Sequence, residues 1–177
     1  DLVFSNCSYC GSCPSNIFKR QNISIVYNGI DRMDNTSGYT NNNCVSCCAI
    51  CNRAKRSATY DQFIEWLSRI SCYDRSTHQG VPTDPVMQGN NAFRFLIYEY
   101  EQQAKYRRID FHLDAESFYL LVFSVCYYCG KSPSNTFRRD KQFVIYNGID
   151  RIDNEKGYTS ENCIPCCKMC NYGRRDM

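Results

Sequence analysis

The chain has 177 residues, a formal net charge of +3 and 14 cysteines. Its longest wholly apolar run, residues 118–123, is far shorter than the roughly 20 residues that a membrane-spanning helix needs, so neither a membrane span nor a membrane partner is expected. The small net charge leaves any binding of nucleic acid to local basic patches rather than to the overall charge.

The first 58 residues predict a small mixed element. Residues 23–27 are β-prone, and Asn28-Gly29 can turn or bulge the chain before a strand over 30–34. Residues 35–42 form a polar loop with a glycine. A short strand over 44–47 follows, and Cys48 opens a short helix.

An amphipathic helix is predicted next. Apolar residues recur at helical spacing from Phe63 to Ile70. Thr59 and Gln62 have the spacing of a capping box, in which each side chain binds the backbone N–H of the other residue. The helix is therefore expected to begin directly after Thr59.

The middle of the chain is predicted to form a linker followed by two more helices. Residues 76–91 contain two prolines and two glycines, which favour a linker. Helical spacing of apolar residues resumes over 93–100, and Asp114 can cap a further helix. These apolar stripes are interpreted as core packing.

The chain repeats itself. A shift of 119 residues, the interval from Asp31 to Asp150, places residues 1–58 on 120–177 without a gap. The predicted domains are a first copy (1–75) without an N-terminal helix, the linker (76–91), and a second copy (92–177) without a C-terminal helix. Two explanations stay open: a fragment of a longer protein, or a tandem whose halves complete each other.

The spacing of the cysteines favours metal binding over disulfides. Cys7-x-x-Cys10 is followed by four cysteines within residues 44–51, and paired CxxC knuckles suit a tetrahedral zinc ion. Six cysteines recur in the second copy, whereas Cys13 is replaced by Ser132 and is not expected to be a ligand. Thiolate zinc sites fit a reducing compartment, so an intracellular protein of the cytoplasm or nucleus is expected.

A longer pattern resembles the HNH, or ββα-metal, endonuclease family, in its zinc-bound branch common in phages and restriction systems. The pattern is Cys7-x-x-Cys10, Gly29-Ile30-Asp31-Arg32-x-Asp34, Gly38-Tyr39, Asn43 and Cys48-x-x-Cys51-Asn52, and it recurs from Cys126 to Asn171. The resemblance implies an α+β fold of two small zinc-stabilised ββα-metal modules with flanking helices, and a gene that a virus can carry.

The resemblance also implies one structural zinc ion per module. The cysteines offer two registers, because the knuckle can pair with an earlier or a later CxxC. The earlier pairs are Cys44 with Cys47 and Cys163 with Cys166. The resemblance favours the later pairs, which give the ligand sets Cys7, Cys10, Cys48 and Cys51, and Cys126, Cys129, Cys167 and Cys170.

A catalytic divalent ion, Mg²⁺ or similar, is implied beside the zinc. Asp31 and Asp150 match the family's first-strand aspartate, which binds this ion. Asn52 and Asn171 match the helix position of the second ligand. Carboxylate and amide oxygens suit a hard ion.

The remaining motif residues carry other implied roles. Asn43 and Asn162 match the asparagine that braces the loop and first strand. Arg32 and Arg151 stand where most members have the general-base histidine. Arginine cannot accept a proton but can hold a phosphate with its planar fork. The base is then a tyrosine, a metal-activated water or a phosphate oxygen; His112 precedes only the second copy.

These residues predict a metal-dependent DNA endonuclease acting on double-stranded DNA. The alternatives are a zinc-stabilised DNA-binding module that has lost cleavage, and a structural zinc protein. Two modules can mimic a dimer and address opposite strands. Basic residues near each motif could bind phosphates: Lys19, Arg20, Arg53, Lys55, Arg56, Arg138, Arg139, Lys141, Arg174 and Arg175.

Overall fold

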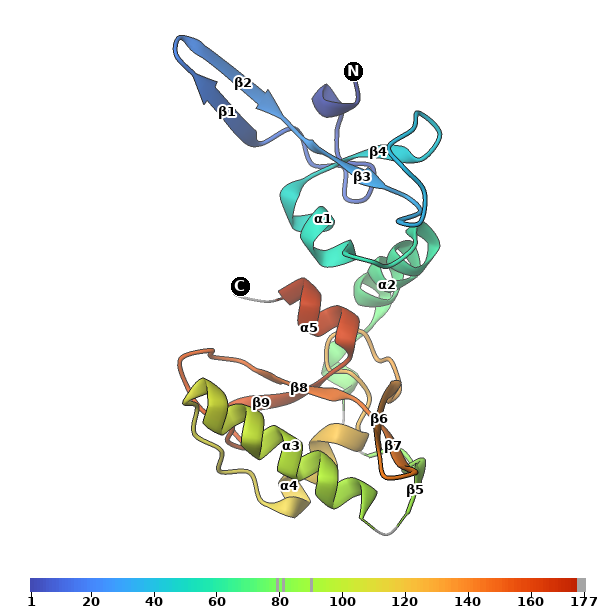
Figure 1. Cartoon of the computed structure of the whole chain (residues 1–177), viewed down its shortest axis with the longest axis vertical. Coiled ribbons are helices and arrows are strands. Elements are labelled where there is room, and N and C mark those ends of the chain that lie inside the picture. The colour runs from blue at the N-terminus through green and yellow to red at the C-terminus, as the bar shows by residue number, and fades with distance from the viewer. Residues whose placement is uncertain (79, 81, 90, 175–177) are drawn as a thin grey trace. The chain divides into compact units, whose positions relative to one another are not determined.

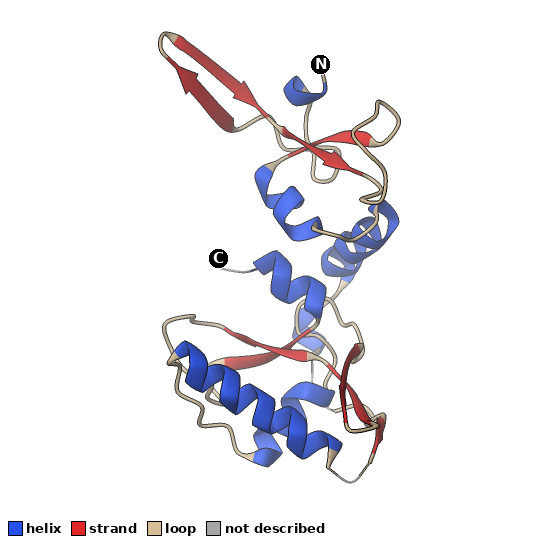
Figure 2. Ribbon diagram, in the orientation of Figure 1, coloured by secondary structure: helices blue, strands red, loops and turns tan. Residues whose placement is uncertain are grey.

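The chain has a mixed α+β structure, as the sequence predicts. A computed structural model describes residues 1–78, 80, 82–89 and 91–174. Within them, five α-helices and nine short strands form two compact units (Figures 1 and 2). Unit 1 comprises Asp1–Ser68 together with Tyr172–Arg174, and unit 2 contains Arg69–Asn171. The division falls within the last helix of each copy of the repeat, and each of these helices is described below with the copy that it ends. Among the described residues, no helix combines the length and apolar character needed to cross a membrane.

Unit 1 consists of two β-hairpins followed by helices. After a 3₁₀ turn at Leu2–Phe4, the elements are β1 (Asn16–Arg20), β2 (Ile23–Tyr27), β3 (Gly29–Arg32), β4 (Cys44–Cys47), α1 (Ala49–Lys55) and α2 (Tyr60–Cys72). Strand β1 pairs antiparallel with β2, and β3 pairs antiparallel with β4. The β1–β2 hairpin extends away from β3, β4 and α1 (Figure 1).

Helix α2 begins where its capping box predicts. The Thr59 backbone N–H donates to the Gln62 side chain (3.1 Å), and the Gln62 N–H donates to the Thr59 hydroxyl (3.3 Å). The apolar face buries Phe63 and Trp66, whose rings stack at 5.2 Å between centroids. The Phe63 ring also meets Tyr9 edge-on at 4.9 Å, so this helix packs on the cysteine knuckle.

Unit 2 repeats this order behind two additional helices. Its elements are a 3₁₀ turn (Arg75–Thr77), β5 (Met87–Gln88), α3 (Ala92–Arg107), α4 (Ala115–Phe123), β6 (Asn135–Arg139), β7 (Gln142–Tyr146), β8 (Gly148–Arg151), β9 (Cys163–Cys166) and α5 (Lys168–Arg174). The predicted cap of α4 is confirmed, because Asp114 accepts a hydrogen bond from the Ser117 N–H (2.7 Å). Strands β8 and β9 form a hairpin as β3 and β4 do.

The apolar core of unit 2 lies between α3, α4 and the β6–β7 hairpin. Leu96, Phe118, Val122 and Val144 are at most 1% exposed. Each fully buried side chain of this kind contributes about 1.5–3 kcal/mol relative to an exposed one. Helix α3 packs on both β6 and β7 (Figure 2).

Part of the region predicted as a linker is structured. Strand β5 pairs with β7, with Met87 opposite Val144. The Ile145 N–H donates to the Val86 carbonyl oxygen (2.8 Å), and the Thr83 N–H donates to that of Phe123 (2.8 Å). Residues 82–88 therefore belong to the fold of unit 2 rather than only connecting two domains.

Candidate functional site

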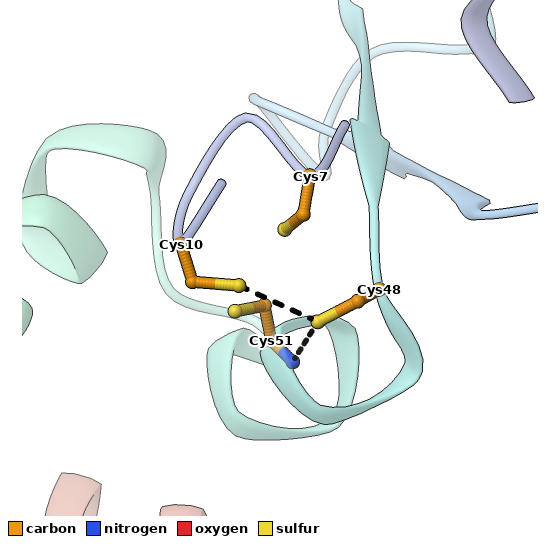
Figure 3. A group of neighbouring side chains, drawn as sticks. All are labelled: Cys7, Cys10, Cys48 and Cys51. Atoms are coloured by element: carbon orange, nitrogen blue, oxygen red, sulfur yellow. Dashed lines mark hydrogen bonds between the residues drawn. The ribbon is translucent and has the colours of Figure 1, made fainter. Parts of the chain in front are cut away.

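Four cysteines meet at one point in unit 1 (Figure 3). Cys7 and Cys10 lie on a turn before β1, which a hydrogen bond from the Gly11 N–H to the Cys7 carbonyl oxygen closes (2.8 Å). Cys48 is the N-cap of α1, and Cys51 lies in the first turn of that helix. The four sulfur atoms all lie within 4.8 Å of one another.

The spacing of these sulfur atoms fits a zinc ion. A tetrahedral site with Zn–S bonds of 2.3 Å has edges of about 3.8 Å. The Cys10 and Cys48 sulfur atoms lie 3.8 Å apart. Unit 2 repeats the cluster with Cys126, Cys129, Cys167 and Cys170, and its Cys129 and Cys167 sulfur atoms also lie 3.8 Å apart. Each unit thus holds a four-cysteine site that can bind zinc.

The earlier cysteine pairs lie on strands beside these clusters. The Cys47 thiol donates to the Cys48 carbonyl oxygen (3.4 Å), and the Cys166 thiol donates to that of Cys167 (3.5 Å). Burial raises the pKa of the Cys163 thiol to about 11, which keeps it protonated near neutral pH. The four-sulfur groups that the structure assembles are therefore the ones that the later register contains.

Asp31 is buried on the hairpin face that meets α1. It is 5% exposed, and it shares one face of β3 with Gly29 because side chains alternate along a strand. Its carboxylate accepts a hydrogen bond from the Tyr9 hydroxyl (2.5 Å) and forms an ion pair with Lys55 (3.1 Å). In unit 2, Asp150 accepts the corresponding hydrogen bond from Tyr128 (2.7 Å).

Asn52 lies across from the same face of β3. It is three residues before Lys55 on α1, so the two side chains share one side of that helix. A Cβ atom added to Gly29 would lie 3.8 Å from the Asn52 Nδ2 atom and 3.2 Å from the Cys47 carbonyl oxygen. This close approach explains the glycine, and it brings the asparagine and aspartate to one side of the hairpin.

Asn171 occupies the matching place in unit 2. Its Nδ2 atom donates to the Ile149 carbonyl oxygen on β8 (3.3 Å). Gly148 also approaches the opposite strand closely, since an added Cβ would lie 3.1 Å from the Cys166 carbonyl oxygen. The local geometry of the hairpin and helix is therefore repeated.

Asn43 and Asn162 brace the polar loops that follow β3 and β8. Asn43 accepts from the Asp34 N–H and donates to the carbonyl oxygens of Asp34 and Gly38, all at 2.9 Å. Asn162 makes the same three contacts in unit 2, at 2.9–3.0 Å. This geometry agrees with the bracing role that the resemblance implies.

Arg32 and Arg151 both contact their own loops. A guanidinium N–H of Arg32 donates to the Ser37 carbonyl oxygen (2.9 Å), and the group lies 5.0 Å from the centre of the Tyr39 ring. Arg151 donates to the Asn154 carbonyl oxygen (2.9 Å) and lies 5.3 Å from the Tyr158 ring. These contacts stabilise the loops, and phosphate binding by either arginine stays a prediction.

Two other residues named from the sequence bear on the site. His112 is exposed, and its backbone N–H donates to the Tyr158 carbonyl oxygen (2.9 Å), beside the loop of unit 2. Lys55, predicted among the phosphate-binding residues, is instead 1% exposed and paired with Asp31. That prediction is wrong for Lys55, and Arg175 lies outside the described residues.

Four contributors to the site were not predicted from the sequence. Tyr9 and Tyr128 were not recognised as partners of the aspartates, nor Lys55 as an ion-pair partner. Asn28 is fully buried, and its side chain donates to the Ser5 carbonyl oxygen (3.0 Å). The tyrosines and this asparagine recur at the same positions in both copies, which was a signal in the sequence.

Taken together, the fold and the sulfur clusters define a chain with two repeated four-cysteine metal-binding modules. No family model matches it, and no solved structure matches it. It is similar to an uncharacterized protein of Acanthamoeba polyphaga mimivirus, with 34% identity over 176 residues. The match covers 99% of this chain but only 29% of the length of that viral protein.

Proposed function

We propose that the chain is a zinc-stabilised endonuclease of the HNH type, which hydrolyses phosphodiester bonds in DNA with a divalent metal ion. One observation carries the proposal. In unit 1, an aspartate on β3 and an asparagine on α1 lie toward the same face of the β3–β4 hairpin, and the motif recurs in unit 2. The similarity to a viral protein supports a viral setting for such an enzyme.

The two kinds of metal have separate tasks in this proposal. Four thiolates complete a tetrahedral zinc site and leave no position for a reacting water, so zinc stabilises the fold. Asp31 and Asn52, and likewise Asp150 and Asn171, offer the oxygen atoms that Mg²⁺ prefers. An ion bound there would supply Lewis-acid polarisation of a phosphate ester.

The protein's own residues prepare this site. The hydroxyl of Tyr9 fixes the orientation of the Asp31 carboxylate. Burial is the main cause, and this hydrogen bond the next, that raises the pKa of Tyr9 above its usual range. Tyr9 therefore acts as a donor rather than as the general base. Asn43 fixes the loop behind the strand.

A second function is favoured by the ion pair of Asp31. Lys55 approaches both carboxylate oxygens, at 3.1 and 3.4 Å, and Tyr9 occupies one of them as well. A divalent ion must therefore displace or share Lys55. If the lysine holds its place, unit 1 is a zinc-stabilised DNA-binding module without cleavage. The second copy also has a cation at the corresponding position, Arg174, so the same question applies to Asp150.

Incubation of supercoiled plasmid with the purified chain tests the proposal. Cleavage is expected with Mg²⁺ and not with EDTA, and an Asp31→Ala/Asp150→Ala double variant should bind DNA without cutting it. The control is Asp140→Ala, a charge change on an exposed turn. Binding without cleavage by the unaltered chain would select the second function, and absence of both would remove both.

The number of working units can be read in the same assay. If the two units cut opposite strands, Asp31→Ala alone should convert linear product to nicked circles. Linear product that persists at an unchanged rate would show that unit 1 contributes no cut. The single Asp150→Ala variant gives the reciprocal measurement.

A further inference from the structure

The β1–β2 hairpin of unit 1 exposes apolar side chains on the face that bears Ile23 and Ile25. Phe18 and Ile25 lie opposite each other and are 48% and 38% exposed. Ile23, near the hairpin turn, and Phe4, before the hairpin, are each 60% exposed. Contiguous exposed apolar side chains of this kind mark a surface that another segment covers.

The equivalent hairpin of unit 2 is covered. Val144 stands at the position of Ile25 after the shift along the repeat, and Phe123 stands at the position of Phe4; both are 0% exposed. Helix α3 packs on β6 and β7, and its Phe93 ring lies 5.8 Å from that of Phe123. The two hairpins are similarly apolar, so the main difference is that a helix packs on the hairpin of unit 2.

The free edge of the hairpin differs in the same way. In unit 2, β5 adds a third strand beside β7, with Met87 opposite Val144. In the described part of unit 1, β1 and β2 form a sheet of two strands, so the matching edge of β2 has no strand beside it. An open edge next to an apolar face is suited to accept a strand and a helix together.

We propose that the β1–β2 hairpin is a docking surface for a strand-and-helix segment of the β5–α3 kind. The helix presents an apolar stripe to the hairpin, as α3 presents Phe93, Leu96 and Ile97 to the core of unit 2. The strand extends the sheet at the edge of β2. The surface is separate from the zinc clusters and does not depend on the nuclease proposal.

Charge adds specificity to this surface. Arg139 at the end of β6 lies 4.6 Å from the Phe95 ring of α3 and 3.7 Å from the Glu99 carboxylate. Unit 1 has Arg20 at the corresponding position. The docked helix is therefore expected to carry an aromatic residue and a glutamate four positions later on its flank.

One substitution distinguishes the two surfaces. The Gln142 side chain accepts a hydrogen bond from the Asn91 N–H at the start of α3 (2.9 Å), whereas unit 1 has Ile23 at this position. The segment that fits unit 1 best should thus place an apolar side chain, rather than a free N–H, over Ile23.

The chain itself supplies a probe of the right chemistry. A second copy of residues 85–119 is fused directly ahead of Asp1 in the full chain, as the original segment precedes Leu120. Hydrogen exchange of residues 16–27 is then measured, with residues 135–146 of the same molecule as the standard. Exchange of 16–27 should slow about tenfold or more on fusion and approach the standard.

The matched control carries Leu96→Asp and Ile97→Asp in the added copy alone, and it should leave residues 16–27 unprotected. The same segment is also added in trans as a peptide, which should protect residues 16–27 in a saturable way. No protection in either format, or equal protection by the altered copy, overturns the proposal. Protection in the unfused chain that rises with its concentration and with dimer formation would assign the surface to a second copy instead.

Discussion

Unit 1 and unit 2 share a hairpin-and-helix element but bury it differently. In unit 2, α3 and α4 supply a cluster of buried apolar side chains that extends to Val144 and Ile149. In unit 1, half of the buried hydrophobic residues are cysteines of the metal cluster and β4: Cys7, Cys47, Cys48 and Cys51, beside Ala54, Ala58, Phe63 and Trp66. The comparison teaches that the sulfur cluster specifies the local element, whereas the apolar cover is a separate source of stability.

Loss of one zinc ligand should reveal the largest difference in stability between the two units. Cys48→Ser and Cys167→Ser should each reduce bound zinc from two ions to one per chain, since structural zinc contributes about 10–16 kcal/mol to such modules. Unit 1 should then unfold in Cys48→Ser, whereas unit 2 should keep the helical signal of α3 and α4 in Cys167→Ser. Zinc release and circular dichroism measure both effects.

The control for this comparison is Cys13→Ser, because Cys13 is exposed and the second copy has Ser132 at its position. It should retain both ions. Two bound ions in Cys48→Ser would mean that a neighbouring cysteine replaces the ligand.

Removal of the buried lysine should affect unit 1 alone. Lys55→Met leaves the Asp31 charge buried with only Tyr9 beside it, and breaking a buried ion pair costs about 3–5 kcal/mol. Urea unfolding followed by hydrogen exchange in residues 29–47 measures this loss. Addition of Mn²⁺ should restore part of it by pairing with the carboxylate. An unchanged unfolding midpoint would show that the ion pair is not needed for stability.

The loop asparagines should have equal effects in both units. Asn43→Ala and Asn162→Ala each remove three hydrogen bonds to backbone groups, worth about 1 kcal/mol each. Hydrogen exchange in residues 33–43 and 152–162 reports each loop separately. A clearly larger effect in one unit would contradict the view that the hairpin element is the same in both.

The smallest effects are expected from substitutions in the covered hairpin of unit 2 and in the exposed hairpin of unit 1. Val144→Ala should destabilise unit 2 by about 2 kcal/mol, because it opens a cavity in a packed core. Ile25→Ala should change the stability of unit 1 by less than about 0.5 kcal/mol, because its side chain is 38% exposed. Urea titrations of both variants provide the comparison, and equal losses would show that the unit 1 hairpin is covered in solution.

The sequence predicted the parts of the molecule whose signals are local. The capping box at Thr59 and Gln62 and the cap at Asp114 are confirmed, because a cap depends on residues only three apart. The four-cysteine clusters were predictable because each knuckle brings two sulfur atoms together through its own turn. The repeat added a second observation of every motif.

The features that the sequence could not give depend on distant partners. Strand β5 is two residues long and exists through pairing with Val144 and Phe143. Lysine is rarely fully buried, so nothing near Lys55 indicated that it pairs with Asp31, 24 residues away. Strand β1 was missed because Asn16–Arg20 has no clear alternation of apolar and polar residues, and β2 across the turn stabilises it.

Titration of Mn²⁺ into the chain with both zinc sites filled tests the central claim most directly. The account predicts binding that an Asp31→Asn/Asp150→Asn variant loses while it still holds two zinc ions, and tighter binding by unit 1 in Lys55→Met. No binding of Mn²⁺ by the unaltered chain, or binding that the double variant retains, would contradict a hard-ion site at these aspartates.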